Sequence, residues 1–170
     1  RLLKEAGYPD GFSTAFDCVN VSYRQAVCQA IAAMLGRVGI KAGFQTSPSA
    51  LFFPKLTQAT ISLAEFGWAP GGDPWGMLHA IVRSHDGSSA GVFNAGRYSD
   101  ARLDALIDAI RIEPDLERRR QRVGDALRLM QADLPLLPLY RVSHIWAMRP
   151  QVQAVQWPNA VLDLRWVRMD

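Results

Sequence analysis

The stretch from residue 12 to residue 46 changes its hydrophobic period twice, and this pattern constrains the fold more than any other feature. Residues 12–21 alternate loosely between apolar and polar side chains, as a half-buried strand does. The next segment carries apolar side chains at helical spacing, with Ser22 as its predicted N-cap and Gly39 as its stop. Residues 40–46 return to a strand-like run. Two strands joined by a helix favour parallel pairing through a helical crossover, so we predict an α/β fold.

Shorter patterns fill the rest of the chain. In order, we expect the end of a helix at 1–6, a helix at 49–58 interrupted by Pro54, a strand at 61–66, a helix at 74–82, a loop at 84–95, a helix capped by Ser99, a longer helix beginning at Asp115, and short strands at 136–140, 144–148 and 161–167. The predicted buried stripe of the longer helix consists of Leu116, Val123, Leu127, Met130 and Leu134.

Residues 67–76 form a Gly/Pro-rich turn between the predicted strand and helix, and the turn carries two tryptophans and one acid. Loops on a rigid scaffold are where ligand sites concentrate. Trp68 and Trp75 offer large flat faces, while glycines let the backbone approach another molecule closely. Asp73 followed by Pro74 is also typical of a helix N-cap and first helical position. This turn is the first candidate for a binding site.

Composition excludes several classes of function. The chain has 170 residues, a length suited to one domain, and a net charge of +3 with acids interspersed among the basic residues. The arginine run at 118–122 is flanked by acids and lacks interleaved aromatics, so we interpret it as a solvated helix face and predict no nucleic-acid partner. No apolar run approaches the ~20 residues of a membrane span. The chain starts without Met, and its first residues have the pattern of a helix already under way, so we expect a piece of a longer protein.

No pattern of catalytic or cofactor-binding residues occurs. His79, His85 and His144 do not stand at zinc-ligand spacing, and neither a Gly-x-Ser-x-Gly motif nor a phosphate-binding loop is present. We therefore predict no catalytic residue, no metal site and no cofactor. Cys18 and Cys28 leave open whether they pair in an oxidising compartment; the favoured interpretation is two free, half-buried thiols.

Five short motifs occur together in one order, and the set resembles a known family. The motifs are LKEAGYPDGF at 3–12, IAAMLGRVGIK at 31–41, Gly67-Trp68 followed by Asp73-Pro74, Asn94 with YSDARLDALI at 98–107, and PLLPLY at 135–140. They are similar to those of the family 5 extracellular solute-binding proteins, the dipeptide, oligopeptide and nickel receptors of ABC importers. Each motif alone is weak, but their common order covers nearly the whole chain.

The resemblance implies an α/β lobe of the type II periplasmic-binding-protein fold, with a central mixed or parallel sheet flanked by helices. Residues 1–142 would form the second lobe of a two-lobed receptor, and residues 143–170 a tail returning towards the absent first lobe. The receptor would be periplasmic, or extracytoplasmic and membrane-associated. It would bind a peptide or a solute of similar size without covalent chemistry and pass it to an ABC permease. The sequence leaves open whether this chain forms a homodimer.

The expected ligand-binding set combines the turn with residues that the family motifs indicate: Trp68, Ala69, Pro70, Gly71, Asp73, Trp75, Phe52, Asn94 and Tyr98. Several of these have a structural alternative. Asp73 is favoured as a helix cap, Asn94 and Tyr98 as braces of the preceding loop, and Phe52 and Trp75 suit core packing equally well. The sequence also departs from the peptide-binding members, because Pro70-Gly71 stands where they carry an acid that pairs with the peptide amino group.

Two other functions remain as alternatives. One is an enzyme, hydrolase-like, built on the same scaffold. The other is a protein-interaction domain that uses exposed tryptophans such as Trp68 to dock a partner.

Overall fold

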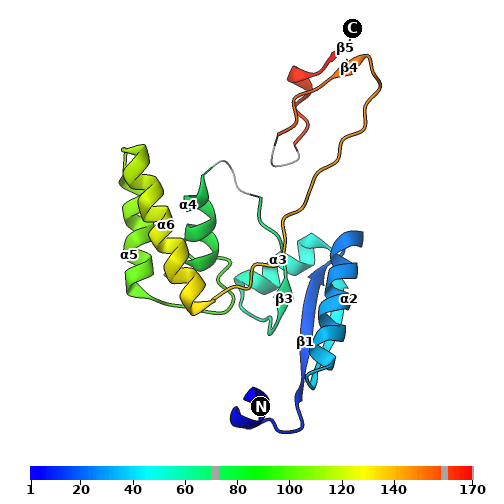
Figure 1. The fold of residues 1–170 in the computed structure, drawn as a ribbon, viewed down its shortest axis with the longest axis vertical. Coiled ribbons are helices and arrows are strands. Elements are labelled where there is room, and N and C mark those ends of the chain that lie inside the picture. The colour runs from blue at the N-terminus through cyan, green and yellow to red at the C-terminus, as the bar shows by residue number, and fades with distance from the viewer. Residues whose placement is uncertain (70–72, 158–160, 170) are drawn as a thin grey trace.

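The computed structural model describes residues 1–69, 73–157 and 161–169 of the chain, and Figure 1 shows its elements. The helices are α1 (Leu2–Glu5), α2 (Ser22–Gly36), α3 (Ser49–Thr57), α4 (Pro74–Met77), the π-helix η1 (Leu78–Val82), α5 (Ala101–Ile112), α6 (Leu116–Asp133) and the 3-10 helix η2 (Leu164–Trp166). The strands are β1 (Phe12–Val19), β2 (Ile40–Ser47), β3 (Ala64–Glu65), β4 (Val152–Gln153) and β5 (Arg168–Met169).

The central sheet is parallel and has the order β2-β1-β3. β1 pairs with β2 over its whole length, from Phe12 opposite Ile40 to Val19 opposite Ser47. β3 pairs only at Ala64 and Glu65, so the strand predicted at 61–66 is shorter than expected. The helical crossover between β1 and β2 confirms the α/β prediction.

Side chains alternate between the two faces of β1, and a helix covers each face of the sheet. Phe16 and Cys18 point to one face and pack against α2, whereas Val19 points to the other and packs against Phe52 and Leu56 of α3. All five side chains are at most 5% exposed. The sheet is therefore the middle of three layers.

The interpretation of Cys18 and Cys28 as free thiols is wrong, because the structure joins them in a disulfide. Alternation turns Cys18 towards α2, and Cys28 lies on the face of α2 that packs on the sheet, with 6.7 Å between the two Cα atoms. Both residues are fully buried. The bridge ties the first strand to its crossover helix.

A second cluster of helices packs beside the sheet (Figure 1). Its core consists of Leu78, Ile81, Val82, Leu103, Ile107, Ile110 and Ala126. The helix predicted at 74–82 is continuous, but it changes from α4 to the π-helix η1 at Leu78. The predicted buried stripe on α6 is wrong at three positions: Leu116, Leu127 and Leu134 are 72%, 36% and 57% exposed, while Val123 and Met130 are partly buried against the core. Leu116 begins the helix, and Leu134 follows it with a φ of 49°.

Two predicted caps are displaced by one residue. Val21, not Ser22, is the N-cap of α2 and makes no side-chain cap bond. Asp100, not Ser99, caps α5 by accepting hydrogen bonds from the N–H groups of Arg102 and Leu103. In both places the backbone dihedrals decide which residue is the cap. The sequence alone does not separate two adjacent positions at a helix start.

The C-terminal tail extends from the end of α6 past β3 and away from the rest of the molecule (Figure 1). The strands predicted at 136–140 and 144–148 are wrong, because this part of the tail is irregular; the region 161–167 holds η2 in place of a strand. Among the described residues of the tail, β4 and β5 form an antiparallel pair near the tip. Within the ranges that the structure describes, no helix is long and apolar enough to cross a membrane.

Candidate functional site

The carboxyl ends of β1 and β3 meet at one edge of the sheet, and the chain leaves them in different directions. After β1 it enters α2 and passes to β2 on one side, while β3 lies on the other side of β1 and leads towards α4. Parallel sheets of this order bind ligands in the crevice at such a switch between neighbouring strands. The residues just after β1 and β3 are therefore the place to look for a site.

Trp68 lies at this edge, three residues beyond the end of β3, and is 38% exposed. Its ring meets Phe93 edge-on with 5.6 Å between ring centroids, and Phe93 in turn contacts Phe53 at 5.8 Å. Phe53 packs on Phe52, which is fully buried under the sheet. The buried Phe52 thus supports Phe53 and Phe93 from the core, and Trp68 lies at the exposed end of this row of aromatic rings.

The rest of the turn is anchored to the helices. Asp73 accepts a hydrogen bond of 2.7 Å from the N–H of Trp75, which makes it the N-cap of α4, and it also pairs with Arg119 of α6. Trp75 packs against the helical core and stacks on His79 with 4.7 Å between ring centroids. Ala69 is exposed beside Trp68. Pro70 and Gly71 of the predicted set lie outside the described residues.

Asn94 and Tyr98 brace the loop between η1 and α5. The Asn94 amide is 5% exposed; it donates to the carbonyls of Arg83 (3.2 Å) and Tyr98 (2.7 Å) and accepts from the Tyr98 N–H (3.0 Å). The Tyr98 hydroxyl donates to Asp133 at 2.8 Å. Burial and the Asp133 carboxylate raise the pKa of Tyr98 to about 12. Both side chains are therefore occupied in holding the loop.

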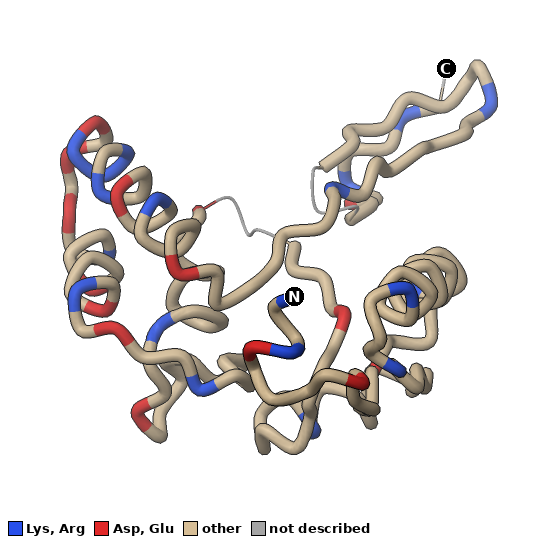
Figure 2. The backbone as a smooth tube through the Cα atoms, turned by 60° about the horizontal axis from the view of Figure 1, so that its bottom comes forward, with Lys and Arg blue, Asp and Glu red and all other residues tan. Residues whose placement is uncertain are grey.

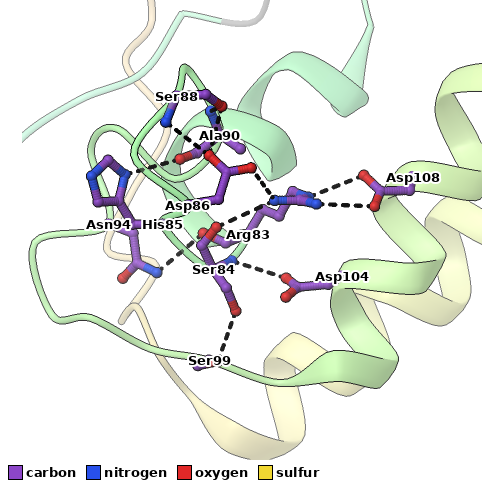
Figure 3. Close-up of polar contacts among 10 residues, drawn as sticks. All are labelled: Arg83, Ser84, His85, Asp86, Ser88, Ala90, Asn94, Ser99, Asp104 and Asp108. Atoms are coloured by element: carbon purple, nitrogen blue, oxygen red, sulfur yellow. Dashed lines mark hydrogen bonds and ion pairs between the residues drawn. The ribbon is translucent and has the colours of Figure 1, made fainter.

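Figure 3 shows how the same loop is tied to α5. Arg83 forms a two-pronged contact with Asp108 at 3.0 and 3.1 Å and also reaches Asp86 at 3.1 Å. The N–H of Ser84 donates to Asp104 at 2.9 Å. The segment predicted as a loop is a loop in the structure, and many specific polar contacts hold it in place.

A charged cluster at the switch point was not predicted. Glu65, the last residue of β3, is 4% exposed and faces Arg24 in the first turn of α2, with 3.4 Å between Oε2 and Nη1. The hydroxyl of Tyr140 donates to Oε1 of Glu65 at 3.3 Å, and Nε of Arg24 donates to the Tyr23 hydroxyl at 3.2 Å. Burial opposes the charged guanidinium, but the Tyr23 hydrogen bond and the Glu65 charge raise the pKa of Arg24 above its ordinary value.

One signal in the sequence could have revealed this cluster. Glu65 is an acid inside the apolar run 61–66, and a buried acid in a strand requires a partner. The partner itself could not be named, because Arg24 is 41 residues away.

Elsewhere, the buried Asp17 of β1 pairs with Lys55 of α3 at 2.6 Å, and most other ion pairs involve at least one exposed side chain. Arg118 and Arg122 both contact Glu113, and Figure 2 shows basic and acidic positions interleaved along α5 and α6. Among the described residues, no group of three or more His, Cys, Asp or Glu side chains could hold a metal ion.

Trp68 itself lines neither of the two hollows of note, although its neighbour Phe93 lines one of them. One, of about 150 Å³, lies between the sheet and the loop and includes Phe66, Phe93 and Leu136 in its lining. The other, about 600 Å³, is an open groove between α2 and β2 lined mainly by small residues such as Ala32 and Gly36. Trp68 and Arg24 are not among the residues that line these two hollows.

Comparison with known proteins gives a consistent result. No protein-family model matches the chain. Heme-binding protein A of Haemophilus influenzae is 26% identical over 165 residues, which covers 93% of this chain and 30% of that protein. The glutathione-binding protein GsiB of Salmonella paratyphi A is 28% identical over 146 residues, covering 82% of this chain and 28% of its own length.

Solved structures agree on the fold. The OppA structure of Haemophilus influenzae in complex with RPPGFSPFR superimposes with a TM-score of 0.78 at 17% identity, covering 99% of this chain and 33% of that one. The chain therefore spans about a third or less of each protein it resembles. The lobe fold expected from the motifs is confirmed, and the relatives are substrate-binding proteins.

Proposed function

We propose that this chain, a segment of a family 5 solute-binding protein, forms one wall of a cleft that captures a solute for an ABC importer. The relatives are binding proteins rather than enzymes, which fits capture without covalent change. The observation that carries the proposal is the half-exposed Trp68 at the carboxyl edge between β1 and β3. An aromatic face held rigidly there can stack on a ligand and bury a large area.

In this proposal residues 1–142 are the second lobe and residues 143–170 the tail that returns to the first lobe. The ligand is buried when the two lobes close, and closure is stabilised because the ligand contacts both lobes only in the closed state. Trp68 and Ala69, with Pro70 and Gly71, supply this lobe's contact. Asp73 and Trp75 contribute by holding the turn, since their polar and aromatic contacts are with the helices.

The solute class follows from the relatives only in outline. The similar proteins are described as binding heme, glutathione and a nine-residue peptide, so the shared property is a ligand of peptide-like size. We propose a peptide or a solute of similar size as the cargo, an extracytoplasmic location, most simply the periplasm, and a membrane permease of the ABC type as the partner. A homodimer forms no part of the proposal.

Native mass spectrometry of the full-length protein, purified without denaturation, tests the proposal. We expect a co-purified small molecule in the wild type. Calorimetry with that molecule should then show a roughly tenfold or greater loss of affinity for Trp68→Ala, as for a buried aromatic contact worth about 1.5–2 kcal/mol.

Tyr8→Ala is the matched control. Tyr8 is also an exposed aromatic residue, but it lies in the turn that precedes β1, at the opposite edge of the sheet. Its replacement should leave affinity unchanged. Absence of any bound solute, or equal losses in the two variants, would contradict the proposal.

A further inference from the structure

Arg119 belongs to the arginine run of α6, and the structure divides this run into two groups. The side chains of Arg118 and Arg120 are 66% and 80% exposed, as a solvated helix face requires. Those of Arg119 and Arg122 are only 21% and 37% exposed. The interpretation of the run as a solvated face is therefore wrong for two of its arginines, which contact neighbouring elements.

The two partly buried arginines share one contact at the end of α5. Nη1 of Arg122 donates to the carbonyl of Ala109 at 3.1 Å, and Nη1 of Arg119 donates to the carbonyl of Ile110. Both carbonyls belong to the last turn of α5, where backbone acceptors lack partners within the helix. Cations at this end also interact favourably with the helix dipole. Both side chains therefore hold α6 against the end of α5.

The two arginines differ in their second contact. Nη2 of Arg122 pairs with Glu113 at 2.9 Å, so this side chain stays within the α5–α6 hairpin. Nη2 of Arg119 instead pairs with Oδ2 of Asp73, which lies 46 positions earlier in the chain. The other oxygen of Asp73 accepts the N–H of Trp75 and so caps α4. One guanidinium thus joins α6, the end of α5 and the start of α4.

This contact bears on the proposed site because Asp73 ends the turn that begins with Trp68. The ring of Trp68 rests edge-on against Phe93. Trp75 has an aromatic support, but among the described residues its buried Nε1 has no hydrogen-bond partner. Of the side chains described between Trp68 and Trp75, Asp73 is therefore the one whose ion pair ties the turn to another element, and Arg119 is its partner there.

We propose that Arg119 is a positioning residue for solute binding, which contacts the turn rather than the solute and keeps Trp68 in place through Asp73. The inference deepens the proposed function and rests on it. A binding group keeps its geometry only when neighbouring side chains hold it, so loss of this anchor lets the turn take other conformations and lowers affinity. A guanidinium can serve both acceptors because its N–H donors form a rigid planar fork, which a lysine lacks.

Two measurements on the full-length protein test this role. Hydrogen exchange, read from the peptide that covers residues 67–76, reports how often the turn opens. Native mass spectrometry reports the fraction of the protein that keeps a co-purified solute. In Arg119→Gln we expect exchange in this peptide to become about fivefold faster and the solute-carrying fraction to fall by roughly half or more.

Arg122→Gln is the matched control, because it removes the same kind of carbonyl contact at the end of α5 but no contact with the turn. It should lower thermal stability at least as much as Arg119→Gln, since Glu113 is only 6% exposed and loses a partner. Exchange at 67–76 and the solute-carrying fraction should nevertheless stay at the wild-type level. A merely structural role would affect both variants alike.

Arg119→Lys provides a second variant. It keeps the charge but not the fork, so both readouts should lie between those of Arg119→Gln and the wild type. It also gives the same comparison at smaller amplitude if Arg119→Gln does not fold.

Unchanged exchange at 67–76 in the Arg119 variants, or an equal increase in Arg122→Gln, overturns the positioning role. A turn that opens more often while the solute-carrying fraction stays at the wild-type level overturns its bearing on binding. A wild type that carries no solute is a separate result and contradicts solute capture itself; the exchange comparison between the two arginines still decides whether Arg119 anchors the turn.

Discussion

At the scale of single residues, Asp100 combines two stabilising contacts in one carboxylate. It accepts the first N–H groups of α5 and forms a two-pronged contact with Arg102, the shorter arm being 2.6 Å. These contacts favour the charged form, so the pKa of Asp100 is lowered from 3.8 to about 2, chiefly by Arg102. The neighbouring Ser99, which the sequence indicated as the cap, bonds Ser84 across the loop instead.

The depressed pKa of Asp100 predicts a pH-dependent contribution to stability. Because the folded pKa lies below the unfolded value, the stabilisation is complete above about pH 4 and is lost as the pH falls towards 2. Asp100→Asn should therefore be less stable than the wild type at pH 7, and the difference should vanish near pH 2. Urea unfolding of both proteins at the two pH values measures this. An equal difference at both would show that the charge of Asp100 plays no part.

At the same scale, the candidate ligand residues divide into two groups. Trp68 is half-exposed and free to meet a solute, whereas Asn94 is buried with its amide fully bonded. The family motifs had indicated both residues as ligand contacts. Exposure and hydrogen bonding, which separate the two roles, depend on side chains brought in from distant parts of the chain.

At the scale of elements, the strand–helix–strand unit could be predicted from the sequence, but the disulfide that links its strand to its helix could not. Local periodicity indicated β1, α2 and β2 with ends correct to within two residues. Whether Cys18 and Cys28 pair depends on which face of each element meets the other, and spacing along the chain does not settle that. The tail strands failed for a related reason: a strand needs a neighbour, and residues 136–148 have no ladder partner within the described parts of the chain.

The disulfide should be a main source of stability for this unit. Cys18→Ala with Cys28→Ala removes a bridge that closes a loop of ten residues, so we expect unfolding to become easier by about 2–3 kcal/mol. Denaturant unfolding in non-reducing buffer measures the change. Cys18→Ala alone should cost a similar amount, because the bridge is lost in both. No loss of stability in either variant would contradict a formed bridge.

At the scale of the whole molecule, the tail leaves much apolar surface uncovered. Ile145 is 93% exposed, and Leu164 and Met169 are 75% and 79% exposed. Figure 1 shows the tail projecting beyond the body of the chain. Apolar surface of this extent marks an interaction site, which accords with the proposed contact to a first lobe.

This arrangement predicts that the 170-residue chain alone is a poor binder. In the proposed receptor the chain supplies one wall of the cleft, so a solute bound to it alone would leave half of its surface in water and gain nothing from closure. Calorimetry with the co-purified solute should show binding at least about a hundredfold weaker than that of the full-length protein. Equal affinity for the two would mean that this chain holds a complete site.

The amino-acid sequence by itself determined the order of elements, the parallel crossover and the exposed turn around Trp68, because hydrophobic period and turn chemistry act between near neighbours. Only the tertiary structure decided the pairing of Arg24 with Glu65 and Tyr140, since residues separated by 41 and 75 positions meet through packing of the sheet. The tertiary structure also decided that Glu65 is buried whereas Trp68, three residues later, is partly exposed. Packing of Glu65 against Arg24 of α2 buries the acid, and that contact is not a local property of the chain.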